Sequence, residues 1–204
     1  MLINGVFKPS MIKQYESVKR MFDVLSSFIG LVLFSLPMII ISILIYGDSK
    51  GPILYKQERL GKNGVPFIMY KFRSMRLDAE SEGPRWAEEN DERCTEIGKF
   101  LRNTRLDELP QLWNILRGDM SFVGPRPERA YFYREFKRTI PDFYKRLQVI
   151  PGLTGYAQVN GGYDLSPEEK LQFDLEYINR RSIGLDLLCM IKTVRLIFTH
   201  EGAR

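Results

Sequence analysis

The most constraining feature of the sequence is an uncharged segment of 23 residues that runs from Val24 to Tyr46. A helix of this length would measure about 34 Å at ~1.5 Å per residue, which is enough to cross the hydrocarbon core of a bilayer. A buried core helix fits less well, because such helices rarely stay apolar on every side over about six turns. A cleaved signal peptide also fits poorly, since no small-residue cleavage site follows the segment. The segment therefore predicts contact with a membrane.

A proline and the flanking charges argue against a simple span. Pro37 removes one helix hydrogen bond and clashes with the carbonyl of Leu33. The positive-inside rule places basic flanks on the cytoplasmic face, and here both flanks are basic. We therefore expect a helix that breaks at Pro37 and enters and leaves the same leaflet; a full span and a buried core helix are the alternatives. The basic residues are Lys13, Lys19 and Arg20 before the segment and Lys50, Lys56, Arg59 and Lys62 after it.

The composition of the whole chain limits its chemistry. The 204 residues predict one domain or two small ones, and 44% hydrophobic with 27% charged residues is ordinary for a globular protein. A net charge of +5 favours an anionic partner, such as nucleic acid, anionic lipid or a phosphorylated small molecule. Cys94 and Cys189 form no metal-binding spacing, and His200 is the only histidine. Catalysis must therefore come from carboxylates, hydroxyls, lysines or cysteines.

The rest of the chain predicts a mixed α/β fold. We expect residues 1–48 to hold an interfacial segment and the re-entrant helix, and residues 49–204 to form a small cytoplasmic domain with interfacial amphipathic helices. Two strand-like runs joined by an Asn-Gly turn predict a β-hairpin, and an acidic stretch at 78–96 predicts a solvated helix or loop. A turn is expected at 151–155, and Ser166 and Glu169 are expected to form a capping box at the start of the helix that follows. The hairpin strands are expected at 53–57 and 65–72, and the short helices at 97–101, 105–118, 128–139, 142–147, 166–179 and 185–198.

Two adjacent carboxylates are the strongest candidates for chemistry. Pro110 fits only within a first helical turn, which places Asp107 and Glu108 at a helix N-terminus, where free N–H groups and the helix dipole keep carboxylates ionised. First-turn acids are common, so the pair alone does not establish a site. Carboxylates among arginines do suit Mg²⁺ and phosphates, and an ionised Asp can attack phosphorus. The nearby arginines are Arg102, Arg105, Arg117, Arg126 and Arg129.

A rigid loop around Arg126 and two further basic residues extend the candidate site. The two prolines of the Pro-Arg-Pro run fix the backbone around Arg126, and Lys71 and Arg73 follow the second strand-like run. A guanidinium group can bind a phosphate through two parallel hydrogen bonds. No glycine-rich nucleotide-binding fingerprint is present. From the residues alone, the chain is a membrane-attached domain suited to phosphate esters.

Four sequence motifs, taken in their order along the chain, resemble those of a known family. They resemble the bacterial monotopic phosphoglycosyl transferases, also called bacterial sugar transferases, in a small minimal form. The resemblance implies transfer of a sugar-1-phosphate from a UDP-sugar to polyprenol (undecaprenyl) phosphate, with release of UMP. The product would begin bacterial glycoconjugate assembly, for example of an exopolysaccharide, O-antigen, capsule or glycoprotein. The runs are KRMFD (19–23), YKQERLGKNGVPFIMYKFRSM (55–75), RLDELPQLWNILRGDMSFVGPRPE (105–128) and VIPGLTGYAQVNG (149–161).

The resemblance also implies roles for individual residues. Asp107 would be the nucleophile that forms a covalent phosphosugar, and Glu108 would bind Mg²⁺. The membrane helix would be re-entrant and bent at Pro37, with the catalytic domain at the cytoplasmic face of the bacterial inner membrane and membrane lipid as a partner. Lys19 and Arg20 would lie near the polyprenol phosphate. The residues expected to contact the donor are Lys71, Arg73, Arg102, Arg105 and Arg126.

Some questions stay open at this stage. A non-catalytic membrane-anchored scaffold that binds a phosphorylated ligand is the main alternative, and a phosphatase using Asp107 is another. Nucleic-acid binding is not expected, because no such motif is present and the membrane segment accounts for the basic flanks. The chain has Tyr156 where the family usually carries Trp. The sugar, the glycan pathway, a homodimer and the roles of Tyr156 and Asp174 are not determined by the sequence.

Overall fold

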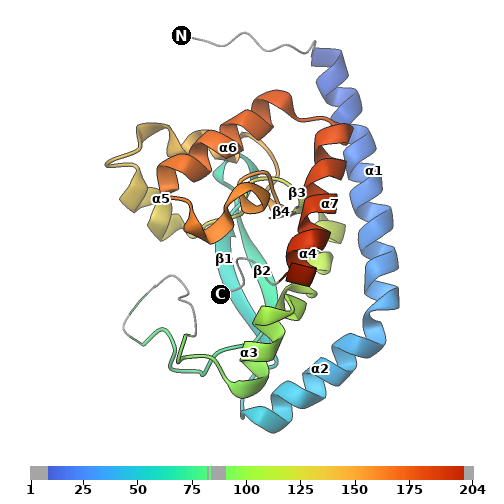
Figure 1. Ribbon diagram of the computed structural model, residues 1–204, viewed down its shortest axis with the longest axis vertical. Helices are drawn as coiled ribbons and strands as arrows, with labels where there is room; N and C mark the ends of the chain where they lie inside the picture. The colour runs from blue at the N-terminus through green and yellow to red at the C-terminus, as the bar shows by residue number, and fades with distance from the viewer. Residues whose placement is uncertain (1–8, 82, 84–90, 200–204) are drawn as a thin grey trace.

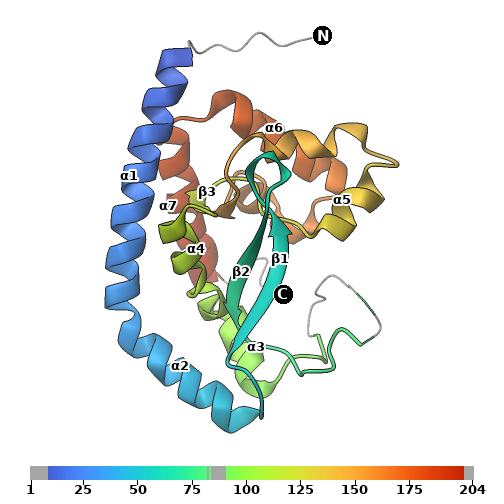
Figure 2. The same cartoon turned by 180° about the vertical axis from the view of Figure 1, so that it is seen from behind.

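Two N-terminal helices form one flank of the molecule. The computed structural model describes residues 9–81, 83 and 91–199, and its helices α1 (Pro9–Leu33) and α2 (Ser35–Asp48) run down one side of the remaining fold (Figures 1 and 2). Within this described part, no single helix has both the length and the apolar character needed to cross a membrane. The pair formed by Ser10–Leu33 and Ser35–Asp48 meets that requirement jointly, but it is bent by 59°.

The bend lies at Phe34, three residues before the predicted break at Pro37. The structure corrects the position because a proline is tolerated in a first helical turn, where the N–H groups have no acceptor within the helix. The new helix therefore starts at Ser35 and takes Pro37 into its first turn. Backbone hydrogen bonds continue on both sides of the bend, from Phe34 N to Gly30 O at 2.9 Å and from Met38 N to Phe34 O at 2.8 Å.

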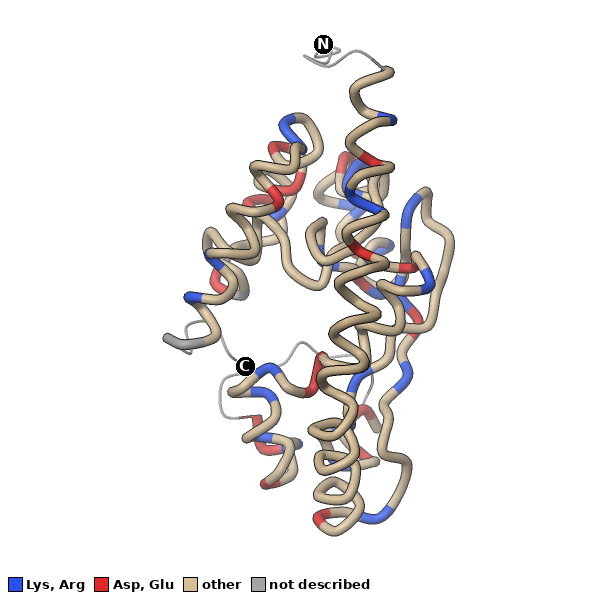
Figure 3. The backbone as a smooth tube through the Cα atoms, turned by 90° about the vertical axis from the view of Figure 1, so that its right-hand side faces the viewer, with Lys and Arg blue, Asp and Glu red and all other residues tan. Residues whose placement is uncertain are grey.

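Apolar side chains along α1 and α2 stay exposed. The tube in Figure 3 shows charged residues in the first part of α1 and an uncharged stretch that continues into α2. Only one side of α2 is covered, where Ile41 and Ile45 pack with Phe72 and Leu101. Exposed apolar surface of this extent marks an interaction face. The most exposed members are Met21, Leu25, Phe28, Val32, Leu33, Leu36, Ile39, Ile43 and Tyr46.

The predicted β-hairpin is confirmed. Strands β1 (Leu54–Leu60) and β2 (Pro66–Phe72) pair in antiparallel register, so that Leu54 faces Phe72. The short 3₁₀ turn η1 (Lys62–Gly64) joins them, and Asn63 adopts a left-handed conformation with φ 59°, as asparagine tolerates. Met69 of β2 packs with Leu112 and Ile115, and this contact fixes the hairpin against the helix that follows the candidate carboxylates.

A second sheet was not predicted. Strands β3 (Ser121–Val123) and β4 (Gly152–Thr154) pair in parallel, so the turn predicted at 151–155 is wrong. Strands of three residues are too short to show an alternating pattern. The two backbones also approach so closely that a Cβ on Gly152 would lie 2.1 Å from Gly124 N. A glycine that the sequence presents as a turn residue is thus required for strand packing.

The remaining elements surround the two sheets. The predicted capping box is confirmed, since the Ser166 and Glu169 side chains each accept from the other's backbone N–H. The helix predicted at 128–139 is shorter, and the one predicted at 142–147 is a 3₁₀ helix. Of the acidic stretch at 78–96, residues 82 and 84–90 lie outside the described residues, as does His200. The elements are α3 (Glu96–Asn103), η2 (Leu106–Glu108), α4 (Gln111–Arg117), α5 (Ala130–Phe136), η3 (Pro141–Gln148), η4 (Gln158–Asn160), η5 (Gly162–Asp164), α6 (Pro167–Arg180) and α7 (Ile183–Thr199).

Candidate active site

The two candidate carboxylates lie in a tight turn that precedes α4. The prediction placed them in the first turn of an α-helix, whereas the structure begins α4 at Gln111 and holds Asp107 and Glu108 in the 3₁₀ turn η2. Pro110 explains the difference, because it has no N–H to continue an α-helical ladder through this point. Arg105 enters the turn in a left-handed conformation with φ 57°, which is uncommon for a residue with a side chain.

Three segments converge on the carboxylates. Lys71 at the end of β2 places Nζ 2.7 Å from Oε1 of Glu108 and 3.7 Å from Oδ2 of Asp107. Arg126, in the extended loop after β3, places Nη2 2.6 Å from the same Oε1. The structure therefore brings together four predicted residues that lie up to 55 positions apart in the sequence. Glu108 has short contacts to both cations, whereas the contact of Asp107 to Lys71 is longer, at 3.7 Å.

The environment gives the two carboxyl groups different pKa values. Burial raises the pKa of Asp107, and the charge of Glu108 adds to this, while Lys71 opposes it. Burial alone would also raise the pKa of Glu108, but Arg126 and Lys71 outweigh it and hold that pKa well below its usual range. Glu108 is thus firmly ionised. Asp107 is a desolvated carboxyl with a longer contact to Lys71, which suits a nucleophile.

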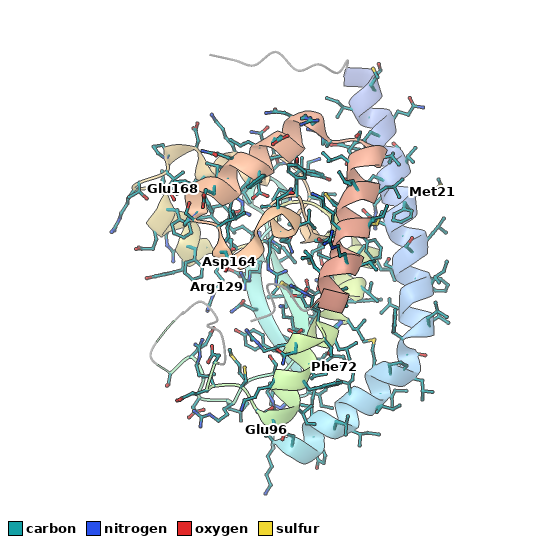
Figure 4. All side chains as sticks on the ribbon, in the orientation of Figure 1. Met21, Phe72, Glu96, Arg129, Asp164 and Glu168 are labelled. Atoms are coloured by element: carbon teal, nitrogen blue, oxygen red, sulfur yellow. The ribbon has the colours of Figure 1, made fainter. Side chains whose placement is uncertain are left out.

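A large basic cavity opens beside Asp107. Its volume is about 1020 Å³, which is at the upper end of the range for small-molecule sites. The predicted residues Lys71, Arg102, Arg105 and Arg126 all line it, together with further arginines. A cavity lined mainly by positive charge concentrates anions and favours a substrate with several phosphates. Lining residues that were not predicted as site residues include Arg59, Arg129, Phe132, Arg146, Gln158 and Asp164 (Arg129 and Asp164 are labelled in Figure 4).

Arg73 lines the cavity wall, but its guanidinium forms hydrogen bonds with residues at the end of α2. It donates to Oγ of Ser49 at 2.8 Å and to the carbonyl of Lys50 at 3.1 Å, and the residue is only 5% exposed. These contacts connect the end of β2 to the end of α2. The structure therefore gives Arg73 a structural contact that the sequence prediction did not include.

Lys19 and Arg20 lie away from the carboxylate pair, on α1. Lys19 Nζ is 2.8 Å from Oδ2 of Asp186 on α7. Arg20 donates to the carbonyls of Ile115 and Leu116 at 2.6 and 2.7 Å, which satisfies the C-terminal end of α4. Neither residue, nor Pro37 on α2, lines the cavity.

The two residues whose roles were left open are both packed. Asp174 is 1% exposed and accepts from Arg146, with its Oδ2 2.6 Å from Nη2 of that residue. Tyr156 packs edge-on against Phe173, with ring centroids 5.8 Å apart. Their partners lie 28 and 17 residues away in the sequence, and no local sequence pattern predicts such contacts.

The donor groups that are present can be compared with those that a divalent cation requires. The part of the chain that the structure describes holds no group of three or more His, Cys, Asp and Glu side chains able to bind a metal. Mg²⁺, however, is commonly bound through one or two carboxylates together with substrate phosphates and water. Asp107 and Glu108 fit that pattern. Lys71 and Arg126 both donate to Oε1 of the Glu108 side chain, so within the described part of the chain Oε2 is the oxygen that can bind a metal.

Comparison with known proteins identifies the family. The model of the bacterial sugar transferase family matches residues 14–200. The chain is 43% identical over 203 residues to the UDP-N-acetylgalactosamine-undecaprenyl-phosphate N-acetylgalactosaminephosphotransferase of Aeromonas hydrophila, covering 98% of this chain and 48% of the relative. It is 53% identical over 135 residues to a Bacillus subtilis protein that carries the provisional name undecaprenyl-phosphate N-acetylgalactosaminyl 1-phosphate transferase. This match covers 66% of this chain and 75% of the relative.

A third relative differs in the sugar that its name gives. It is the UDP-glucose:undecaprenyl-phosphate glucose-1-phosphate transferase of Klebsiella pneumoniae, 39% identical over 190 residues, covering 91% of this chain and 41% of the relative. The chain thus spans about half the length, or less, of the Aeromonas and Klebsiella relatives that it matches. A family match over nearly the whole sequence leads to one conclusion: this chain belongs to the bacterial sugar transferase family.

Proposed function

We propose that this chain is a phosphoglycosyl transferase that moves a sugar-1-phosphate from a UDP-sugar to undecaprenyl phosphate and releases UMP. The observation that carries the proposal is Asp107, a buried carboxyl beside the Glu108–Lys71–Arg126 cluster at the wall of a basic cavity. The names of the relatives support the same reaction. The product would be the first membrane-bound intermediate of a bacterial glycoconjugate.

The reaction follows from the roles of these groups. The cationic lining binds the diphosphate and neutralises its charge, which is most of what phosphoryl transfer requires from a protein. An oxygen of Asp107 attacks the sugar-bearing phosphorus, the bond from that phosphorus to the bridging oxygen breaks, and UMP leaves. The phosphate oxygen of undecaprenyl phosphate then attacks the same phosphorus and expels Asp107 as a carboxylate. The product is the undecaprenyl diphosphate sugar.

We also propose Mg²⁺ as the cofactor, which Glu108 and the phosphates of the donor would hold. A bound Mg²⁺ would neutralise charge on the diphosphate. Lys71 and Arg126 keep Glu108 ionised, and a carboxylate ligand must be ionised to bind a metal.

The bent α1–α2 pair would attach the enzyme to the membrane. Its apolar side chains are exposed, and basic residues flank it on both sides. The two helices together, but neither one alone, have the length and composition of a membrane segment. We propose a re-entrant segment that opens to the cytoplasmic face of the inner membrane. This placement lets a long polyprenol stay in lipid while its phosphate meets a water-soluble nucleotide sugar. Lys19 and Arg20 would then lie near the level of the lipid phosphates.

The proposal is tested by turnover in detergent with Mg²⁺, undecaprenyl phosphate and a panel of UDP-sugars. UDP-N-acetylgalactosamine is tried first, because the Aeromonas relative carries that sugar in its name. The expected result is UMP release in excess of the amount of enzyme, together with a lipid-linked sugar diphosphate, both dependent on the acceptor. Donor binding without UMP release for every donor would instead support a scaffold. Release of sugar phosphate into water, with no lipid product, would support a phosphatase.

A further inference from the structure

The loop that carries Arg126 is held at four successive carbonyl groups. Gly152 N donates to the carbonyl of Pro125 at 3.0 Å, and Leu60 N donates to that of Glu128, also at 3.0 Å. The two carbonyls between them are held by side chains. Arg146 Nη2 donates to the carbonyl of Arg126 at 3.1 Å, and Arg59 Nη1 donates to that of Pro127, also at 3.1 Å.

Both arginines are themselves fixed by carboxylates. Arg146 is 3% exposed and contacts Oδ2 of Asp174 through Nε at 2.9 Å and through Nη2 at 2.6 Å. Arg59 contacts Oε2 of Glu128 at 3.1 Å. A desolvated ion pair of this kind is a weak source of stability, because the cost of removing both charges from water offsets their attraction. Fixing a loop in one place is a role that such a pair can have.

We infer that Arg146 and Arg59 are positioning residues for the transfer reaction, acting through the backbone of Arg126. Their contacts set where the Arg126 guanidinium lies, and that guanidinium reaches Oε1 of Glu108 at 2.6 Å. A displacement of about 1 Å in a group that aligns a reaction can cost on the order of 10²-fold in rate. The inference rests on the proposed function, and it assigns these two arginines a role in kcat rather than in substrate binding.

The test replaces each ion pair by uncharged side chains. Changing Arg146 alone would leave Asp174 charged, buried and unpaired, whereas replacing both members is often neutral for stability. The first variant is therefore Arg146→Met with Asp174→Leu, and the second is Arg59→Met with Glu128→Gln. The matched control is Lys145→Gln with Asp142→Asn, which removes an exposed ion pair next to Arg146.

Turnover, KM for the donor and Tm are measured for each variant, both alone and combined with Arg126→Gln. We expect each ion-pair variant to lower kcat at least about tenfold, with KM changed less than about threefold and the control unchanged. In the Arg126→Gln background the same changes should lower kcat by less than about threefold, because they act through Arg126. If one variant fails to fold, as judged by a lost unfolding transition, the other carries the test.

Two results would overturn the inference. Equal fold losses with and without Arg126→Gln would mean that the arginines act independently of Arg126. A raised donor KM with unchanged kcat would mean that they bind substrate directly from the cavity wall. An inactive parent enzyme would contradict the proposed function itself, whereas an active parent with additive losses contradicts only this inference.

Discussion

The guanidinium of Arg126 lies 2.6 Å from Oε1 of Glu108, 18 residues away in the sequence. The ammonium of Lys71 lies 2.7 Å from the same oxygen. Two cations therefore share one oxygen of Glu108, while the contact of the adjacent Asp107 to Lys71 is longer, at 3.7 Å. This arrangement divides the pair into a firmly ionised carboxylate that can bind a cation and a less constrained carboxyl that can attack phosphorus.

Arg126→Gln should lower kcat/KM by about 10²-fold. The change removes a charge-assisted hydrogen bond to Glu108 and one of the cations that line the cavity. Steady-state UMP release measures the effect, and Lys145→Gln, which alters an exposed lysine, serves as the control. A loss below about threefold would show that the Arg126–Glu108 contact has no part in the reaction.

Lys71→Met should move the acid limb of the kcat/KM profile to higher pH. Burial raises the pKa of Asp107, and Lys71 is the strongest opposing influence, so removing it raises that pKa further. A nucleophile with a raised pKa becomes protonated, and thus inactive, at a higher pH. The profile is measured from the rate of UMP release at low donor concentration, with Lys99→Gln as an exposed control. An unmoved limb, or one at lower pH, would contradict this assignment of Asp107.

Lys19→Met separates two roles for a predicted lipid-phosphate residue. Its ammonium is 13% exposed and pairs with Asp186, which joins α1 to α7. If that pair is what matters, the unfolding free energy should fall by about 2 kcal/mol and Tm by about 4–8 °C, with no change in KM for the acceptor. Thermal unfolding in detergent measures this, with Lys13→Gln as control. An unchanged Tm with a raised acceptor KM would instead support the phosphate role.

Ile39→Asp together with Ile43→Asp should release the protein from lipid vesicles. Both side chains are exposed on one face of α2, at 57% and 65%. A charged residue in a membrane segment costs about 2.5–3.5 kcal/mol on insertion scales. Co-sedimentation with anionic vesicles measures binding. Val65→Asp is the control, because Val65 is 63% exposed beside the hairpin turn. Retained binding of the double variant would show that α2 does not enter the membrane.

Features specified by neighbouring residues were predictable from the sequence. The Asn-Gly turn of the hairpin and the Ser166–Glu169 capping box are local patterns, and both are confirmed. The bent apolar helix was also predictable, but its break moved to Phe34, because Pro37 is compatible with a first helical turn. The parallel pairing of β3 with β4 joins segments about 30 residues apart and has no local signal.

For the candidate site, too, some features were predictable from the sequence and others depend on the tertiary fold. Asp107 and Glu108 were found from their place beside Pro110 and from the resemblance to a family. Arg73 was chosen because it follows the second strand-like run, and Arg20 from the resemblance to the family, yet their observed partners include the backbone carbonyls of Lys50 and Ile115. A side chain's charge can be read from the sequence, whereas the distant acceptor that it finds depends on the tertiary fold.

The measurement that tests the central claim most directly is the intact mass of the enzyme after incubation with Mg²⁺ and UDP-sugars in the absence of acceptor. The account predicts a mass increase of one sugar phosphate on the native enzyme, with an equal amount of UMP released. Asp107→Asn should give no adduct, while Asp142→Asn, which changes an exposed carboxylate, should react normally. Full turnover with undecaprenyl phosphate but no adduct with any donor that is turned over would mean direct transfer, and would contradict Asp107 as the nucleophile.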